Sequence, residues 1–99
     1  MEGDVSDDPE YLSERVDVPP GAGKLRVFVT APADVALRRS VECVVLHGFG
    51  GDWYRDEYPP EIVFGERWFI TRDVRCADSA LVQLTGDGAT LCRIQTRLD

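Results

Sequence analysis

The stretch Lys24-Leu25-Arg26-Val27-Phe28-Val29-Thr30 decides the fold class of this chain. Leu25, Val27 and Val29 occupy alternate positions, and polar or aromatic residues fill the positions between them. Side chains two residues apart point to the same side of a β-strand, so this alternation predicts a strand with one face in the core.

Strand-like segments recur on both sides of this stretch, and short turns rich in Gly or Pro separate them. No segment predicts the helix of about ten or more residues that a parallel crossover needs. The pattern therefore predicts a mainly β fold of about six to seven antiparallel strands, arranged as a sandwich or a small barrel. Gly65-Glu66 and Gly86-Asp87-Gly88 predict hairpins, and Asp34 predicts the cap of a single helical turn. The predicted strands cover residues 16–18, 24–30, 41–46, 61–64, 67–73, 79–85 and 89–98.

The N-terminal segment differs in composition from the rest of the chain. Residues 1–17 contain seven of the 18 acidic residues and one of the 11 basic residues, which accounts for most of the formal net charge of −7. Segments with high charge and few apolar residues do not bury enough surface to fold. We therefore expect a flexible, disordered acidic leader at 1–17, in which 8–15 forms at most one or two helical turns capped by Asp8. A single β domain follows at 18–99.

Composition also indicates a compartment and excludes some classes of partner. The apolar runs, such as residues 44–46, are at most four residues long, which is too short for a membrane helix. Met1 is not followed by the basic and apolar regions of a secretory signal. We therefore expect a soluble, cytoplasmic protein with no membrane partner. Because the domain is nearly neutral, we expect no basic patch and no nucleic-acid partner.

The three cysteines, Cys43, Cys76 and Cys92, lie far apart and lack the CxxC spacing of a metal site. Cys43 and Cys92 fall in predicted strands. In a reducing cytosol we expect them to be buried thiols, whereas an oxidising compartment would favour a disulfide between them. Cys76 stands in a polar loop, where we expect an exposed thiol. No pattern predicts a cofactor, a metal centre or a catalytic group, so we do not expect an enzyme.

The order Cys43, Trp53, Cys92 within residues 24–98 resembles that of immunoglobulin domains, in which two strand cysteines flank a tryptophan. Thr90 stands two residues before Cys92, where that family has a tyrosine. The resemblance implies an antiparallel sandwich of that general kind and implies no function.

Residues 49–60 contain the residue types that dominate binding hot spots, because Trp, Tyr and Arg combine a large contact area with a polar group. The glycines at 48–51 predict a sharp reversal, so we interpret the segment as an exposed aromatic loop. Burial of Trp53 and Tyr58 in the core is the alternative. The predicted binding residues are Phe49, Asp52, Trp53, Tyr54, Arg55 and Tyr58.

Small size, acidity and the lack of a catalytic motif favour a protein-binding module, such as an inhibitor, an immunity-type protein or an adaptor. Two alternatives stay open. One is a structural subunit of an assembly such as a phage or virus particle, or a homo-oligomer, in which edge strands pair between chains. The other is a small-ligand binder or enzyme around His47 and Asp52, with Cys76 as a further candidate.

Overall fold

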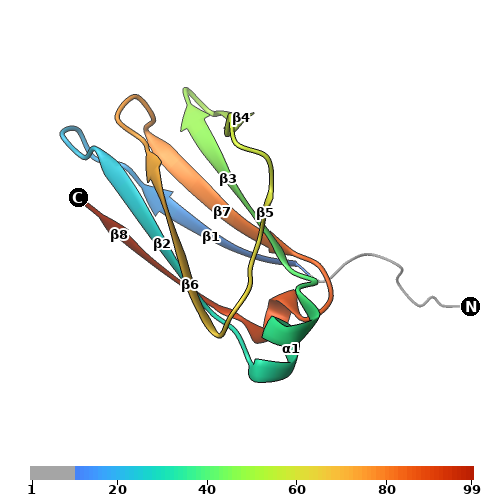
Figure 1. The fold of residues 1–99 in the computed structure, drawn as a ribbon. Helices are drawn as coiled ribbons and strands as arrows, with labels where there is room; N and C mark the ends of the chain where they lie inside the picture. The colour runs from blue at the N-terminus through green and yellow to red at the C-terminus, as the bar shows by residue number, and fades with distance from the viewer. Residues whose placement is uncertain (1–10) are drawn as a thin grey trace, which may run out of the picture.

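Two antiparallel β-sheets lie face to face in the computed structural model, which describes residues 11–99 (Figure 1). The prediction of an antiparallel sandwich is confirmed, and each sheet has its own strand order rather than forming part of a closed barrel. The elements in chain order are β1 (Tyr11–Asp17), β2 (Lys24–Thr30), α1 (Ala33–Arg38), β3 (Glu42–Phe49), β4 (Asp52–Arg55), β5 (Glu61–Ile62), β6 (Arg67–Asp73), β7 (Ser79–Thr85), the 3-10 turn η1 (Ala89–Leu91) and β8 (Arg93–Leu98).

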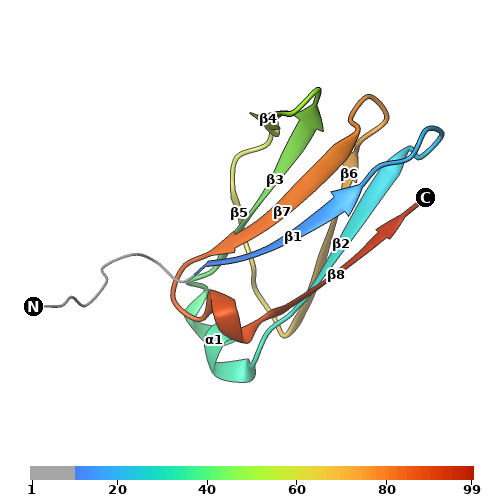
Figure 2. The same cartoon turned by 180° about the vertical axis from the view of Figure 1, so that it is seen from behind.

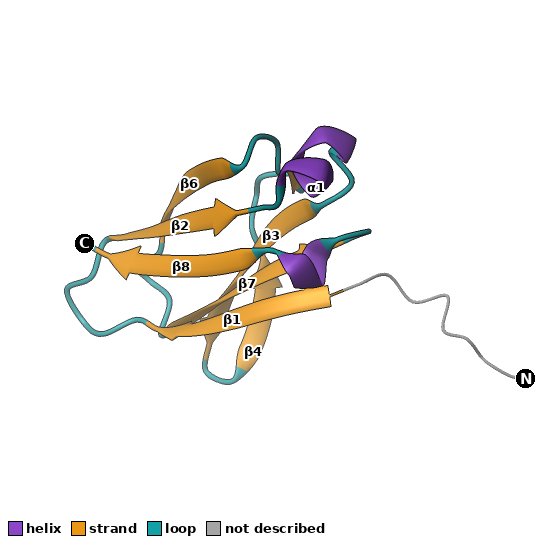
Figure 3. Ribbon diagram, turned by 90° about the horizontal axis from the view of Figure 1, so that it is seen from below, coloured by secondary structure: helices purple, strands orange, loops and turns teal. Residues whose placement is uncertain are grey.

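The five-stranded sheet has the order β1-β7-β3-β4, and β5 also pairs with β3. The three-stranded sheet has the order β6-β2-β8. Figure 2 shows β1, β7 and β3 side by side from behind, and Figure 3 shows the three-stranded sheet as a separate layer. The edge strands of the larger sheet are therefore β1 on one side and β4 and β5 on the other, and those of the smaller sheet are β6 and β8.

The alternation in the sequence places aliphatic side chains between the sheets. Leu25, Val27 and Val29 of β2 are at most 1% exposed, so the predicted face is the buried one. Val82 and Leu84 of β7 belong to the same core and are fully buried. Burial of each such side chain contributes roughly 1.5–3 kcal/mol, so these two central strands supply much of the stabilisation.

Two turns that predict hairpins instead connect the two sheets. β5 pairs with β3 whereas β6 pairs with β2, so Gly65-Glu66 lies in a crossover. In the same way β7 pairs with β3 and β8 pairs with β2, and the chain crosses between the sheets through 86–92. Both hairpin predictions are wrong because a turn signal reports a chain reversal and not the strand with which the next segment pairs.

Gly86 allows the second crossover to pass close to another segment. Its φ angle is +121°, and a Cβ there would lie 2.0 Å from the carbonyl oxygen of Ser40. Only glycine combines this backbone conformation with so close an approach. The Ser40 hydroxyl also donates a hydrogen bond of 2.5 Å to the carbonyl of Asp87, so the chain before β3 and the crossover are held together.

The predicted end of the leader at residue 17 is wrong. Residues 11–17 form strand β1, which pairs with β7 from Tyr11↔Thr85 to Asp17↔Ser79 and so extends the expected edge strand at 16–18. Leu12 and Val16 pack against the core from alternate positions, which the helical interpretation of 8–15 did not anticipate. The sandwich therefore includes residues 11–17, and the rest of the leader predicted at 1–17, residues 1–10, lies outside the described residues.

The strand order differs from that of immunoglobulin domains. In that family the last strand lies beside the preceding one, whereas here β8 pairs with β2 and β7 pairs with β3. Cys43 and Cys92 are buried thiols, as expected for a reducing environment, and Trp53 is 39% exposed instead of packing in the core. The resemblance therefore extends to the sandwich class and not to the strand order or the core.

The single predicted helical turn is present as α1. Its N-cap is Pro32, and Asp34 lies in its first turn, so the predicted cap is displaced. Within residues 11–99 no helix is long and apolar enough to cross a membrane.

Candidate binding site

The β3–β4 hairpin carries most of the residues that we predict to bind. Gly50 and Gly51 form its two-residue turn with φ angles of 58° and 93°, and Phe49 pairs with Asp52 across it. Two successive positive φ angles are typical of a type I′ turn, which suits the natural twist of paired strands. The predicted reversal is confirmed. The predicted aromatic loop is wrong for residues 52–55, because this tight turn pairs them directly with β3 as strand β4.

A carboxylate at the start of β7 holds the turn of the hairpin. The Gly50 amide donates a hydrogen bond of 3.0 Å to Asp78 Oδ2, and the Ser79 hydroxyl donates one of 3.0 Å to Asp78 Oδ1. These bonds favour the ionised carboxylate, and the bond from Gly50 contributes most to lowering the pKa of Asp78. The ionised carboxylate of Asp78 therefore helps to hold the turn of the hairpin in place.

We predict that the protein loses stability in acid partly through this carboxylate. A carboxyl group whose pKa is lower in the folded state stabilises the fold above its unfolded pKa, and this contribution disappears as the pH falls through the folded value. Urea unfolding midpoints measured between about pH 5 and pH 2 should therefore fall less steeply for Asp78→Asn than for the wild type. Equal slopes in the two proteins would contradict this role.

The strand register divides the predicted binding residues between two faces. Cross-strand partners point to the same side of a sheet. Tyr54 therefore lies beside His47 on the inner face, and Trp53 lies beside Gly48 on the outer face. The rings of Phe49 and Tyr54 meet edge to face, with centroids 5.6 Å apart. Trp53 and Tyr54 therefore cannot contact the same flat surface.

Gly48 leaves room for the ring of Trp53 across β3. A Cβ on Gly48 would lie 3.0 Å from that ring and 2.2 Å from Ser79 Oγ, so a side chain here would displace one of them. The guanidinium of Arg15 on β1 lies 5.6 Å from the Trp53 ring centroid, which is cation–π distance. The outer face thus presents a Trp53–Arg15 pair beside a hollow of about 320 Å³.

The remaining predicted residues are exposed but do not join these pairs. Asp52 and Arg55 lie exposed on β4. Tyr58 is 53% exposed, and its ring centroid lies 4.3 Å from the guanidinium carbon of Arg72. Neither Trp53 nor Tyr58 is therefore buried in the core. The structure brings Phe49 to Tyr54 and Trp53 to Arg15, and it places Tyr58 at a third position.

A charged cluster joins the segment between β4 and β5 to strand β6. The Arg72 side chain is 9% exposed; its Nε donates a hydrogen bond of 2.5 Å to Asp56 Oδ2, and a terminal nitrogen donates one to Glu61. Asp56 is itself only 8% exposed. Burial opposes the charge of Arg72, but the hydrogen bonds to Glu61 and Asp56 outweigh it and raise its pKa.

The sequence reasoning missed Arg72, although the sequence contains a signal. Ile70, Arg72 and Val74 occupy alternate positions, and all three are buried. An arginine at a buried position of a strand needs an acidic partner from a neighbouring segment, because burial of an unpaired charge costs free energy. The acidic residues at 56–61 were therefore candidates for that partner.

The surroundings of His47 do not assemble a catalytic group from the predicted residues. Its Nε2 lies 3.9 Å from Asp56 Oδ1, so its carboxylate neighbour is Asp56 and not Asp52. Cys43 stands four residues earlier on the same strand, about 13 Å away. Burial raises the pKa of Cys43 to about 12, so this thiol stays protonated. Cys76 is exposed in the loop after β6, and residues 11–99 contain no cluster of three His, Cys, Asp or Glu side chains that could hold a metal ion.

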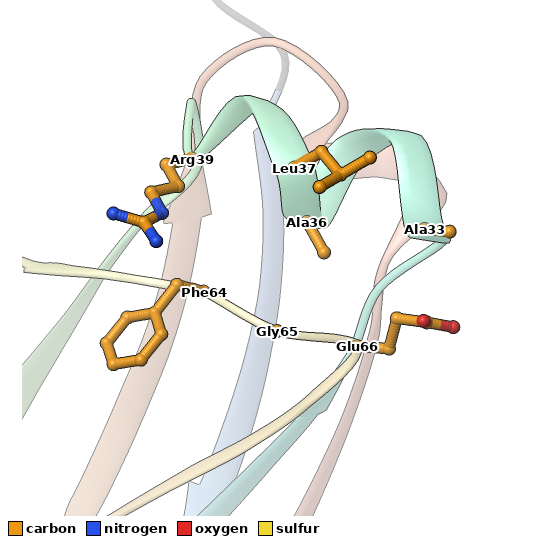
Figure 4. Close-up of a pocket in the computed structure, with 7 residues that line it drawn as sticks. All are labelled: Ala33, Ala36, Leu37, Arg39, Phe64, Gly65 and Glu66. Carbon is orange, nitrogen blue, oxygen red and sulfur yellow. The ribbon is translucent and has the colours of Figure 1, made fainter.

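A second hollow, of about 530 Å³, lies at the opposite end of the sandwich between α1 and residues 64–66 (Figure 4). Arg39 points toward the ring of Phe64, with its guanidinium 5.8 Å from the ring centroid, and Ala36 points from α1 toward Gly65. Leu37 on α1 is 82% exposed. None of the predicted binding residues lies in this hollow.

Comparison of the chain with protein-family models, with curated proteins and with solved structures finds no match in any of the three.

Proposed function

We propose that this chain is a protein-binding module that acts through the β3–β4 hairpin, in the manner of an intracellular inhibitor, immunity-type protein or adaptor. The observation that carries the proposal is the exposure of three large aromatic side chains on one hairpin, at the end of β3 and on the edge strand β4. Phe49, Trp53 and Tyr54 are 38%, 39% and 52% exposed.

The hairpin is held in place before any partner binds. The type I′ turn and the Asp78 carboxylate fix its backbone, and the Phe49–Tyr54 and Trp53–Arg15 contacts restrict its side chains. Ordering of loops and side chains is a main cost of association. An aromatic surface that is already ordered therefore loses less conformational entropy on binding, and more of the free energy of burying it contributes to affinity.

The free edge of β4 explains how aromatic residues on two faces could serve one partner. Among the described strands, β4 pairs only with β3. A partner that adds an extended segment beside an edge strand places its side chains on both faces of the sheet. Such a segment would reach Trp53 on the outer face and Phe49 and Tyr54 on the inner face.

The test compares four baits in capture from a lysate of the source organism, followed by affinity measurement on the recovered partner. The baits are the full chain and its Trp53→Ala, Tyr54→Ala and Leu37→Ala variants, the last of which truncates an exposed apolar residue away from the hairpin. Each hairpin variant should raise the Kd by about 30-fold or more, since truncation at a hot spot costs about 2 kcal/mol or more. Leu37→Ala should leave the Kd unchanged.

A partner that binds all four baits equally, or that loses affinity only with Leu37→Ala, would refute the hairpin as the contact surface. Recovery of the chain itself as the partner would replace the proposal by self-association through edge strands.

A further inference from the structure

The outer face of the three-stranded sheet carries an arrangement of charge and aromatic rings that the net charge of the chain conceals. The register places residues of β6, β2 and β8 in rows across this face. Arg67, Thr30 and Arg93 form the first row, and Phe69, Phe28 and Gln95 form the second. Thr71, Arg26 and Arg97 form the third, and Lys24 and Asp73 begin the fourth. In Figure 3 no described element lies over this face.

The first row contains two guanidinium groups without an acidic partner. Within residues 11–99 neither Arg67 nor Arg93 forms an ion pair, and both are exposed. In the third row Arg26 and Arg97 both contact Asp99, at 2.6 Å and 3.1 Å, so that row keeps one uncompensated positive charge. The face is therefore positive, although the whole chain carries a formal net charge of −7.

An apolar ridge separates the two basic rows. The rings of Phe28 and Phe69 stack with centroids 5.9 Å apart, and Phe69 remains 59% exposed. A hollow of about 310 Å³ lies beside the two rings, with Arg67 at its rim. Successive rows on one face are about 6.8 Å apart, because they are two residues apart along a strand.

We propose that this face is a second binding surface, which takes an extended, acidic segment of a partner protein. In such a segment alternate side chains are also about 6.8 Å apart. One carboxylate of the segment would lie between Arg67 and Arg93. The next side chain on the same side of the segment would be apolar and would pack on Phe69. The one after it would be a second carboxylate that approaches Arg26. Arg binds carboxylates through two parallel hydrogen bonds, which fits a basic face that has only one Lys.

The arrangement of the rings favours a peptide over a single-stranded nucleic acid. Nucleic-acid platforms present separate aromatic faces on which successive bases stack. Here Phe28 and Phe69 stack on each other and so form one ridge, which suits a single apolar side chain. A long polyphosphate would also meet the repulsion of a chain with a net charge of −7, whereas a short acidic segment brings few charges.

The test uses display of a random nine-residue peptide library against the full chain, with measured affinities for the enriched peptides. These peptides should alternate acidic and apolar residues. The Arg67→Gln/Arg93→Gln variant should raise their Kd by about 10-fold or more, since it removes the charge-assisted hydrogen bonds to a carboxylate of the peptide. Arg39→Gln, which removes an exposed guanidinium that lies outside these rows, beside Phe64, is the matched control and should leave the Kd unchanged.

Three outcomes would overturn the proposal: no enrichment of acidic peptides, equal binding to the wild type and the double variant, or tighter binding of a ten-residue oligothymidine than of any peptide. Trp53 lies on the other sheet. A peptide whose Kd rises with Trp53→Ala and not with Arg67→Gln/Arg93→Gln would therefore bind the hairpin instead of this face. Failure of this surface is thus distinguishable from failure of the proposed hairpin site.

Discussion

Replacement of Arg72 by Met is expected to lower the free energy of unfolding by about 3–5 kcal/mol, because it leaves the buried carboxylate of Asp56 without its cation. Asp56 is 8% exposed and Glu61 is 38% exposed, and both accept hydrogen bonds from Arg72. Without the guanidinium, Asp56 must be desolvated with no compensating charge. The segment between β4 and β5 would also lose its attachment to β6. Chemical denaturation at neutral pH measures the change.

Two further variants decide whether the loss comes from the buried charge. Arg75→Met removes an exposed guanidinium that pairs with Asp73 and should lower the free energy of unfolding far less than Arg72→Met does, because exposed ion pairs contribute little to stability. The triple change Arg72→Met, Asp56→Asn and Glu61→Gln should recover part of the loss, because no buried charge then lacks a partner. If the triple variant were less stable than Arg72→Met, the explanation by unpaired charge would be wrong.

Gly86→Ala is expected to destabilise the protein by about 3 kcal/mol or more, through backbone strain and a steric clash together. The φ angle of +121° disfavours any residue with a Cβ, and the added carbon would lie 2.0 Å from the Ser40 carbonyl oxygen. Backbone atoms on both sides must move to relieve that contact, so the crossover from β7 toward β8 would shift.

Gly21→Ala is the matched control for this change. Gly21 also has a positive φ angle, +95°, but no atom lies within 4 Å of its added Cβ. It should therefore cost only the backbone strain, about 1–2 kcal/mol. Equal losses at the two glycines would show that the close approach to Ser40 contributes nothing.

The sandwich class was predictable because its main determinant is local. Alternation in 24–30 identifies both β2 and its buried face without reference to any other segment. The pairing of strands was not predictable, because Gly65 and Gly86 mark chain reversals whose partners lie elsewhere in the sequence. Strand β1 was missed because its apolar residues, Leu12 and Val16, stand among charged residues. They form part of a buried strand face only when β1 pairs with β7.

The candidate site was predictable in its residue types but not in its geometry. The sequence predicted Phe49, Trp53 and Tyr54 as binding residues of a loop, with burial of Trp53 as the alternative, and all three side chains are exposed. Their division between two faces depends on the register of β3 and β4, which a single Gly50-Gly51 turn sets. The basic face was not predicted for a related reason. The net charge is a sum over the whole chain, and it does not show that Arg67 and Arg93 lie on either side of Thr30 in the folded sheet.

The strand order also determines when the protein can fold during its synthesis. β1 must wait for β7, and β2 lacks one neighbour until β8 has left the ribosome. An unfinished chain that ends before Ser79 holds only the pairs β3–β4, β3–β5 and β2–β6, so the edge of β3 that pairs with β7 is still free. At about 5–20 residues per second, the last fifth of the chain takes about 1–4 s to translate. During that interval the free edges of β2 and β3 can pair with strands of other chains.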